Sequence, residues 1–199
     1  GSNNIENMTA LLTGNFKPEK GQVWYIPASR EKGSHIAMKE LLIAEGVVVL
    51  IINGEGYHLY YPNKHREIYK SDTLSEDLGV FYKNHKLFKY PLVITGKLCI
   101  SRGATITSMH MFVSYCVLPD MSNKDSLYQL AGRVCGNTKL WSNYKQVTII
   151  CNTKTRDKLF KMEGKVVSLL EKNKKFDNCT FEDFEMINSV SNNAIPIRG

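Results

Sequence analysis

The stretch from Val23 to Ile52, VWYIPASREKGSHIAMKELLIAEGVVVLII, combines two short apolar runs with a helical pattern between them. Val23 to Ile26 predicts a buried strand that ends at Pro27, and the β-branched run Val47 to Ile52 predicts a second strand. Between them, apolar residues from Ile36 to Ile43 recur at roughly helical spacing. A strand, a helix and a strand within about 30 residues form a βαβ unit, so we expect parallel strands joined by a right-handed crossover.

Other runs of strand length extend this pattern along the chain. We expect a five-stranded, mainly parallel core, and the turn signal at 53–56 favours a hairpin with residues 57–61 as the partner strand. Residues 62–73 read as irregular, and residues 153–190 read as a helical extension with a helix-start signal at 180–183. The remaining expected strands are 92–94, 112–117 and 147–151, and the expected helices are 5–12 and 74–88, the latter with Phe88 inward.

Length and composition limit the class of protein. The chain has 199 residues, 43% of them hydrophobic and 23% charged, which suits one α/β domain and a small appendage. The net charge of +7 fits a polyanionic partner without establishing one. No apolar run approaches the length of about 20 residues that a bilayer requires, so we expect no membrane partner. Gly1-Ser2 is typical of a tag-cleavage scar.

The cysteines and histidines predict neither a metal centre nor a disulfide framework. The five cysteines include no Cys-x-x-Cys pair, and the five histidines are scattered. Several of the cysteines lie in apolar runs, where a free thiol behaves as a small hydrophobe. We therefore expect an intracellular, reducing compartment, such as the cytoplasm, the nucleus or a viral replication site.

The segment from Ser126 to Gly136, SLYQLAGRVCG, predicts a short helix with a polar edge. Gln129, Gly132 and Arg133 are three and four residues apart and therefore share one face. A glycine inside a helix costs about 1 kcal/mol relative to alanine, and close approach by a ligand is one reason to accept that cost. Arg133 beside it suits phosphate, because its planar fork can donate two parallel hydrogen bonds. The alternative is an ordinary helix whose arginine faces solvent.

A second polar segment, from Tyr90 to Ile106, YPLVITGKLCISRGATI, lies upstream. Its apolar run 92–94 predicts a buried parallel strand that ends at the turn signal Thr95-Gly96. Ligands bind beyond the carboxyl ends of such strands in open α/β sheets. An Arg-Gly pair, Arg102-Gly103, follows, and the chain then returns to a strand and to the helix that carries Arg133.

These two segments resemble, in order, motifs V and VI of superfamily 2 helicases. Gln-x-x-Gly-Arg resembles motif VI, and Ser101-Arg102-Gly103 resembles the Arg-Gly core of motif V. Both motifs belong to the second RecA-like domain of that family. The resemblance covers residues 20–152 and implies a RecA-like, three-layer α/β domain with a central, mainly parallel sheet. Residues 1–19 would be the tag scar and an N-terminal linker or helix, and residues 153–199 a helical extension and tail.

The resemblance also implies site residues, in three groups. Catalytic residues would face the nucleotide across a cleft between two domains, cofactor-binding residues would support them, and a third group would contact the nucleic-acid backbone. The catalytic group is Gln129 and Arg133; the cofactor-binding group is Arg102, Gly103 and Gly132; the nucleic-acid group is Thr95, Gly96 and Lys97, with Arg30 and Lys32 from the loop after the first strand. The alternatives remain a solvent-facing cation, ordinary turns and a solvated loop. Tyr57, Tyr60 and Tyr61 could stack on bases, or pack within the hairpin.

The chain lacks a Walker A pattern and the Asp-Glu pair of a Walker B strand. The resemblance therefore implies that ATP and Mg²⁺ bind the full-length protein, whose N-terminal RecA-like domain supplies that machinery, and that this chain alone binds neither. It implies a nucleic-acid partner, with DNA favoured over RNA. Gly136 stands where motif VI usually carries a second arginine, and Thr105 replaces the usual acid of motif V. The overall style is similar to helicase-like proteins of large DNA viruses or phages.

Two other functions remain open. One is a non-catalytic nucleic-acid-binding or scaffold module with a RecA-like fold, which the missing second arginine favours. The other is a small-molecule α/β enzyme that uses the loop Asn53 to Gly56, although no catalytic constellation accompanies that loop.

Overall fold

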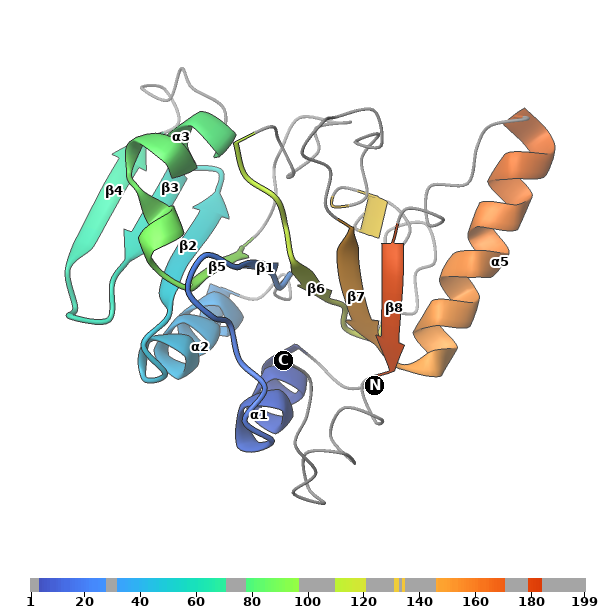
Figure 1. The fold of residues 1–199 in the computed structure, drawn as a ribbon, viewed down its shortest axis with the longest axis horizontal. Helices are drawn as coiled ribbons and strands as arrows, with labels where there is room; N and C mark the ends of the chain where they lie inside the picture. Colours follow the sequence, from blue (N-terminus) through green and yellow to red (C-terminus); the bar gives the residue numbers. More distant parts are fainter. Residues whose placement is uncertain are drawn as a thin grey trace.

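The structure is a computed structural model that describes residues 4–27, 32–70, 78–96, 110–120, 131–132, 134, 146–170 and 179–183. Its strands form one eight-stranded sheet in the order β4-β3-β2-β5-β1-β6-β7-β8 (Figure 1). Six adjacent strands run parallel to one another, in the order β2, β5, β1, β6, β7 and β8. The strands β3 and β4 add an antiparallel pair at one edge. The chain is therefore an α/β protein with a mixed, mostly parallel sheet. The strands are β1 (Val23–Tyr25), β2 (Val48–Asn53), β3 (Gly56–Tyr60), β4 (Arg66–Lys70), β5 (Leu92–Thr95), β6 (Tyr115–Val117), β7 (Val147–Cys151) and β8 (Cys179–Asp183).

Helices cover both faces of the sheet and make three layers. On one side, called the α2 face, α1 (Asn4–Thr13) and α2 (Lys32–Ile43) bury Met8, Leu11, Met38 and Leu42 against the sheet. On the other side, called the α3 face, α3 (Leu78–Asn84), the short η1 (Leu87–Lys89) and α5 (Thr153–Leu170) contribute Phe81, Tyr82, Leu87 and Leu159. The layers separate clearly in Figure 1, with α1 and α2 together on one side and α3 on the other.

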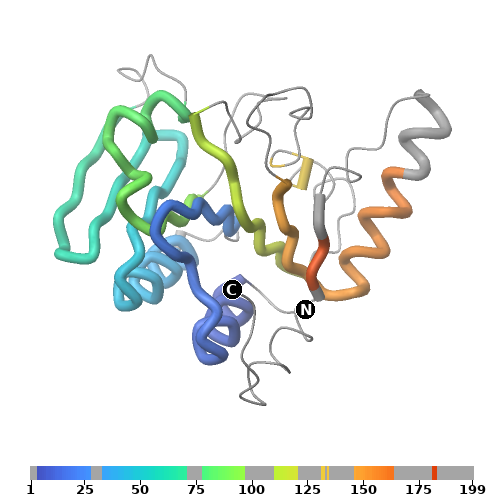
Figure 2. Tube along the Cα trace, viewed as in Figure 1, coloured from blue at the N-terminus to red at the C-terminus, as the bar shows by residue number. Residues whose placement is uncertain are grey.

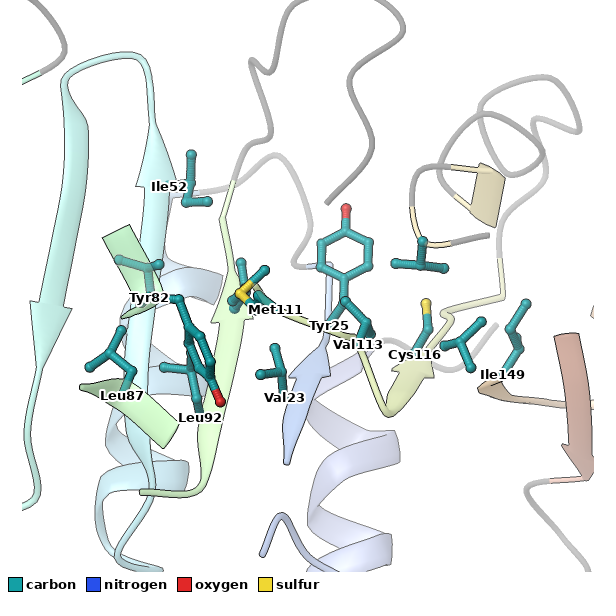
Figure 3. Packing of buried hydrophobic residues seen from close by; sticks show 14 of the residues in the cluster. Val23, Tyr25, Ile52, Tyr82, Leu87, Leu92, Met111, Val113, Cys116 and Ile149 are labelled. Atoms are coloured by element: carbon teal, nitrogen blue, oxygen red, sulfur yellow. The ribbon is translucent and has the colours of Figure 1, made fainter. Parts of the chain in front are cut away.

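Side chains alternate between the two faces of the sheet along each parallel strand, so each strand contributes to both cores. In β1, Val23 and Tyr25 belong to the α3-face core and Trp24 to the α2-face core; β5 repeats this with Leu92 and Ile94 against Val93. Figure 3 shows Val23, Leu92, Met111 and Val113 packed together on the α3 face. Burying both faces explains why these strands are continuous apolar runs rather than alternating ones.

Most predicted elements are present, and the βαβ unit is confirmed. β1, α2 and β2 follow in order, and the first and last are both parallel to β5, which lies between them. The hairpin after β2 is also confirmed, since β3 pairs antiparallel with β2 through a turn at 54–55. Only Tyr115–Val117 of the expected strand 112–117 is regular strand.

Three expectations about the sheet and the helix before β5 were wrong. The parallel core has six strands rather than five, because β8 joins β7. Residues 62–73 are not irregular throughout: β4 occupies Arg66–Lys70 and pairs with β3. Its sequence hides the strand pattern because the apolar Ile68 is exposed and the charged Glu67 is half-buried. Phe88 does not point inward and is 47% exposed. Lys86, in the left-handed conformation, interrupts the helix, and Leu87 is buried instead.

The C-terminal part continues the sheet rather than forming only a helical extension. The helix after β7 is present as α5, but residues 180–183, read as a helix start, lie in strand β8. Phe181 of β8 pairs with Ile149 and contacts Phe160 of α5, with 5.1 Å between ring centroids. Figure 2 shows α5 and β8 side by side at the edge opposite the β3–β4 hairpin. The sheet thus extends beyond residue 152.

Candidate functional site

Strand β1 lies between β5 and β6 in the sheet and runs parallel to both. After β1 the chain enters α2, on the α2 face, whereas Met111 and Val113, which precede β6, pack on the α3 face. β1 is the direct neighbour of β5, and the Ile26 amide donates to the Ile94 carbonyl at 3.0 Å. In open α/β sheets, ligands bind beyond the carboxyl ends of the parallel strands.

Thr95 and Gly96 form the carboxyl end of β5. Thr95 is fully buried, and among the described residues its hydroxyl has no hydrogen-bond partner. A buried hydroxyl without a partner costs about 1–3 kcal/mol, so its retention calls for a reason. Gly96 has φ of +119°, a conformation that other residues rarely adopt. It passes against β2 so closely that a β-carbon would lie 2.3 Å from the Ile52 carbonyl oxygen.

On the other side of β1, the strand ends are held together by α1. The side-chain amide of Asn4, which is buried, donates to the carbonyl oxygens of Pro27 and, at 3.0 Å, of Val117. Asn7 is also buried and donates to the Leu118 carbonyl at 3.5 Å. The Pro27 carbonyl follows β1, and the Val117 and Leu118 carbonyls lie at the end of β6. The first turn of α1 therefore ties the ends of these two strands together. The sequence suggested a helix here but not this polar clamp.

The structure brings some of the predicted site residues together. Thr95 and Gly96 lie at the strand end beside β1, and Lys32 is the first residue of α2, which follows β1. Gly132 is half-buried beside Ala131, which packs in the α3-face core. The side chain of Lys32 is outside the described part of the structure. Also outside it are the other predicted site residues, namely Arg30, Lys97, Arg102, Gly103, Gln129 and Arg133.

The tyrosines of the hairpin make packing contacts. Tyr57 meets Phe81 edge-on with 5.0 Å between centroids, and Tyr61 meets Tyr90 at 5.6 Å. The Lys39 ammonium lies 4.6 Å from the centre of the Tyr60 ring. Partial burial and the nearby charge of Glu67 raise the pKa of Tyr61 to about 12. The loop Asn53 to Gly56 is a tight turn in which Asn53 Oδ1 accepts the Glu55 amide at 2.8 Å.

A polar cluster on the hairpin was not anticipated. Glu67 accepts a hydrogen bond from the Tyr69 hydroxyl at 2.7 Å and lies 3.1 Å from His65 Nε2 and 3.9 Å from His85 Nδ1. The hydrogen bond from Tyr69 is the largest cause that lowers the pKa of Glu67. The cluster joins β4 to the end of α3. Among the described residues, no group of three or more His, Cys, Asp or Glu has the arrangement of a metal site.

A basic groove runs along the start of α5. It has a volume of about 550 Å³ and is lined by Thr153, Lys154, Asp157, Lys158 and Lys161. α5 follows β7 directly, and its start is capped by Asn152, whose Oδ1 accepts the Thr155 amide at 2.7 Å. The spacing of Lys154, Lys158 and Lys161 could have indicated this groove from the sequence, because residues four and three apart share one flank of a helix.

Comparison with known proteins identifies no relative: no protein-family model, no curated protein and no solved structure matches this chain. The helices within the described ranges include none that combines the length and the apolar character needed to cross a bilayer.

Proposed function

We propose that this chain is the second RecA-like domain of an ATP-dependent superfamily 2 helicase or translocase. In this proposal it supplies motifs V and VI, and the first strand, which resembles motif IV, with the loop after it, to a cleft shared with an ATP-binding domain elsewhere in the full-length protein. Opening and closing of that cleft during ATP hydrolysis would move a bound nucleic-acid strand in steps. The order of the Thr-Gly, Arg-Gly and Gln-x-x-Gly-Arg segments is the sequence basis for the proposal.

The structural observation that carries the proposal is the arrangement of β1 and β5. The sheet is parallel over six strands, and the end of β5 lies beside the end of β1, where the chain turns toward α2. Two segments assigned to the nucleic-acid backbone, Thr95-Gly96 and the start of α2, therefore follow neighbouring strands at one edge. A sheet without parallel order would have separated them.

The chemistry at this edge suits a phosphodiester. The Thr95 hydroxyl has no partner among the described residues but is fully buried, so in this proposal it reaches a phosphate oxygen only when the end of β5 opens to the nucleic acid. The positive end of the α2 dipole also favours an anion. None of these groups reads a base, which suits contact that is independent of nucleotide sequence.

The proposal is tested by Arg133→Ala in the full-length protein that contains the ATP-binding domain. We expect nucleic-acid-stimulated ATP hydrolysis to fall by at least about 10²- to 10³-fold, because a cation that stabilises developing phosphate charge is lost. Arg156→Ala is the matched control, since Arg156 is a surface residue that pairs with Asp157 at 3.6 Å. Unchanged hydrolysis in the Arg133 variant would end the motor proposal in favour of a non-catalytic binding module. The isolated 199-residue chain is expected to show no ATP turnover.

A further inference from the structure

The flanks of helix α5 differ sharply in character. Thr155, Leu159 and Glu163 are buried and hold the helix on the α3 face. Lys154, Lys158 and Lys161 occupy a second flank, at spacings of four and three residues. Phe160 lies on the opposite flank, where it contacts Phe181 of β8. Over residues 153–163, the three lysines and the exposed Phe160 are thus on separate sides of the helix, and Arg156, four residues before Phe160, shares the Phe160 flank.

The lysine flank carries net positive charge. Lys158 is 3.7 Å from Asp120, which follows β6, and Asp157 pairs with Arg156. Within the part of the chain that the structure describes, no ion-pair partner lies near Lys154 or Lys161. Both are exposed and line the groove of about 550 Å³. An anion that enters the groove therefore meets three ammonium groups and one carboxylate, Asp157, and one of the ammonium groups, that of Lys158, is also paired with Asp120.

The groove lies at the same edge of the sheet as Thr95-Gly96. α5 begins directly after β7, Asp120 follows β6, and both strands are parallel to β1 and β5 within one sheet. The first turns of α5 are therefore beyond the carboxyl ends of the strands, like the proposed nucleic-acid contact at β5. Figure 1 shows α5 rising from this end of β7 at the far side of the sheet.

We propose that the lysine flank of α5 binds the phosphate backbone of a nucleic acid. From Lys154 to Lys161 the helix rises about 10.5 Å, at about 1.5 Å per residue, and one strand of a B-form duplex carries about three phosphates over that length. Lysine acts as a point charge that does not require a fixed phosphate orientation, which suits contact without sequence preference. An anionic membrane fits less well, because the exposed apolar side chain of α5 is on the other flank.

This inference rests on the proposed function only for the kind of polyanion that is bound. The test uses the 199-residue chain and a fluorescein-labelled 20-nucleotide single-stranded DNA, with affinity measured across a series of salt concentrations. The test variant is Lys154→Gln, Lys158→Gln, Lys161→Gln. The control variant, Lys20→Gln, Lys83→Gln, Lys89→Gln, removes equal charge from exposed lysines elsewhere. Circular dichroism establishes that both variants are folded.

We expect the α5 variant to bind at least about tenfold more weakly, and the slope of log K against log salt to fall by about 2, since each single-strand phosphate contact contributes about 0.7. The control should keep most of the slope. The inference would be overturned if both variants lost DNA affinity equally, or if the wild-type chain did not bind DNA. It would also be overturned if the chain bound only to phosphatidylserine vesicles. If the α5 variant loses DNA binding while Arg133→Ala leaves ATP hydrolysis intact, the motor proposal fails and this inference stands.

Discussion

Gly96 and Ile52 are so close that a β-carbon at position 96 would lie 2.3 Å from the Ile52 carbonyl oxygen and 2.9 Å from its amide nitrogen. Both neighbours are backbone atoms of a central strand and cannot move aside without disturbing the sheet. The glycine also has φ of +119°. The turn after β5 therefore depends on the absence of a side chain.

Gly96→Ala should lower the free energy of unfolding by about 3 kcal/mol or more, because backbone strain and a backbone clash add. Urea denaturation measures the change. Gly33→Ala is the matched control: no atom lies within 4 Å of the added β-carbon, and position 33 is in a helix. We expect it to be neutral or to stabilise by up to about 1 kcal/mol. Equal stability of the Gly96 variant and the wild type would refute the close approach.

Asn4→Asp should destabilise the protein by about 3 kcal/mol. The substitution keeps the shape but replaces an amide donor with a carboxylate that faces the carbonyl oxygens of Pro27 and Val117 in a buried site. Thermal unfolding measures the effect. Thr9→Ala, on the exposed side of α1, serves as control and should change stability by less than about 0.5 kcal/mol. A loss no larger in the Asn4 variant than in this control would mean that α1 does not clamp the strand ends.

Tyr69→Phe should raise the pKa of Glu67 toward its ordinary value, because the Tyr69 hydroxyl is the largest cause that lowers it. A carboxyl whose folded-state pKa is lowered stabilises the protein above its unfolded-state pKa, and this contribution disappears as pH falls through the folded-state pKa. The variant should therefore lose part of the stability difference between neutral and acidic pH. NMR titration of the Glu67 carboxyl measures the pKa. Tyr115→Phe, on β6, is the control and should leave it unchanged; an unshifted pKa in the Tyr69 variant would contradict the hydrogen bond.

Cys116 and Cys151 should resist alkylation in the native protein. Both are buried, and burial raises the pKa of the Cys116 thiol well above its usual value, so little thiolate forms near neutral pH. Modification by iodoacetamide at pH 8 should be slower than in urea by at least about 100-fold, because the thiols become accessible only in opened states. Mass spectrometry of peptides from native and denatured samples gives the two rates. Comparable rates for Cys116 would show that β6 is not in the core.

Local patterns in the sequence were sufficient for the elements that carry strong periodicity. The βαβ unit, the hairpin after β2 and the strand before Thr95 were all predicted, because buried parallel strands appear as continuous apolar runs bounded by turn residues. The importance of Thr95-Gly96 as a strand-ending turn could also be predicted. The sequence did not indicate that Ile52 would fill the space beside Gly96, since that contact depends on the register between β2 and β5.

Elements with weak local signals were missed. β4 alternates exposed and half-buried residues, but the half-buried Glu67 is charged and the exposed Ile68 is apolar, so it is recognisable as a strand only once β3 is beside it. β8 was mistaken for a helix start, because the Thr-Phe-Glu-Asp pattern also suits a capping box and nothing nearby in the chain reveals its partner β7. Phe88 was assigned to the core because a continuous helix would have placed it there, whereas the left-handed Lys86 redirects the chain.

Local sequence patterns were enough to predict an α/β chain, the segments that become its central strands, and the turns that follow β1 and β5. Only the tertiary structure decided that those turns belong to neighbouring strands, that α1 ties β1 to β6 through Asn4, and that the lysines of α5 line a groove at the same edge of the sheet. The physical reason is that periodicity and turn chemistry act over a few residues. Strand order and side-chain contacts between distant segments arise only when the whole apolar surface is buried at once.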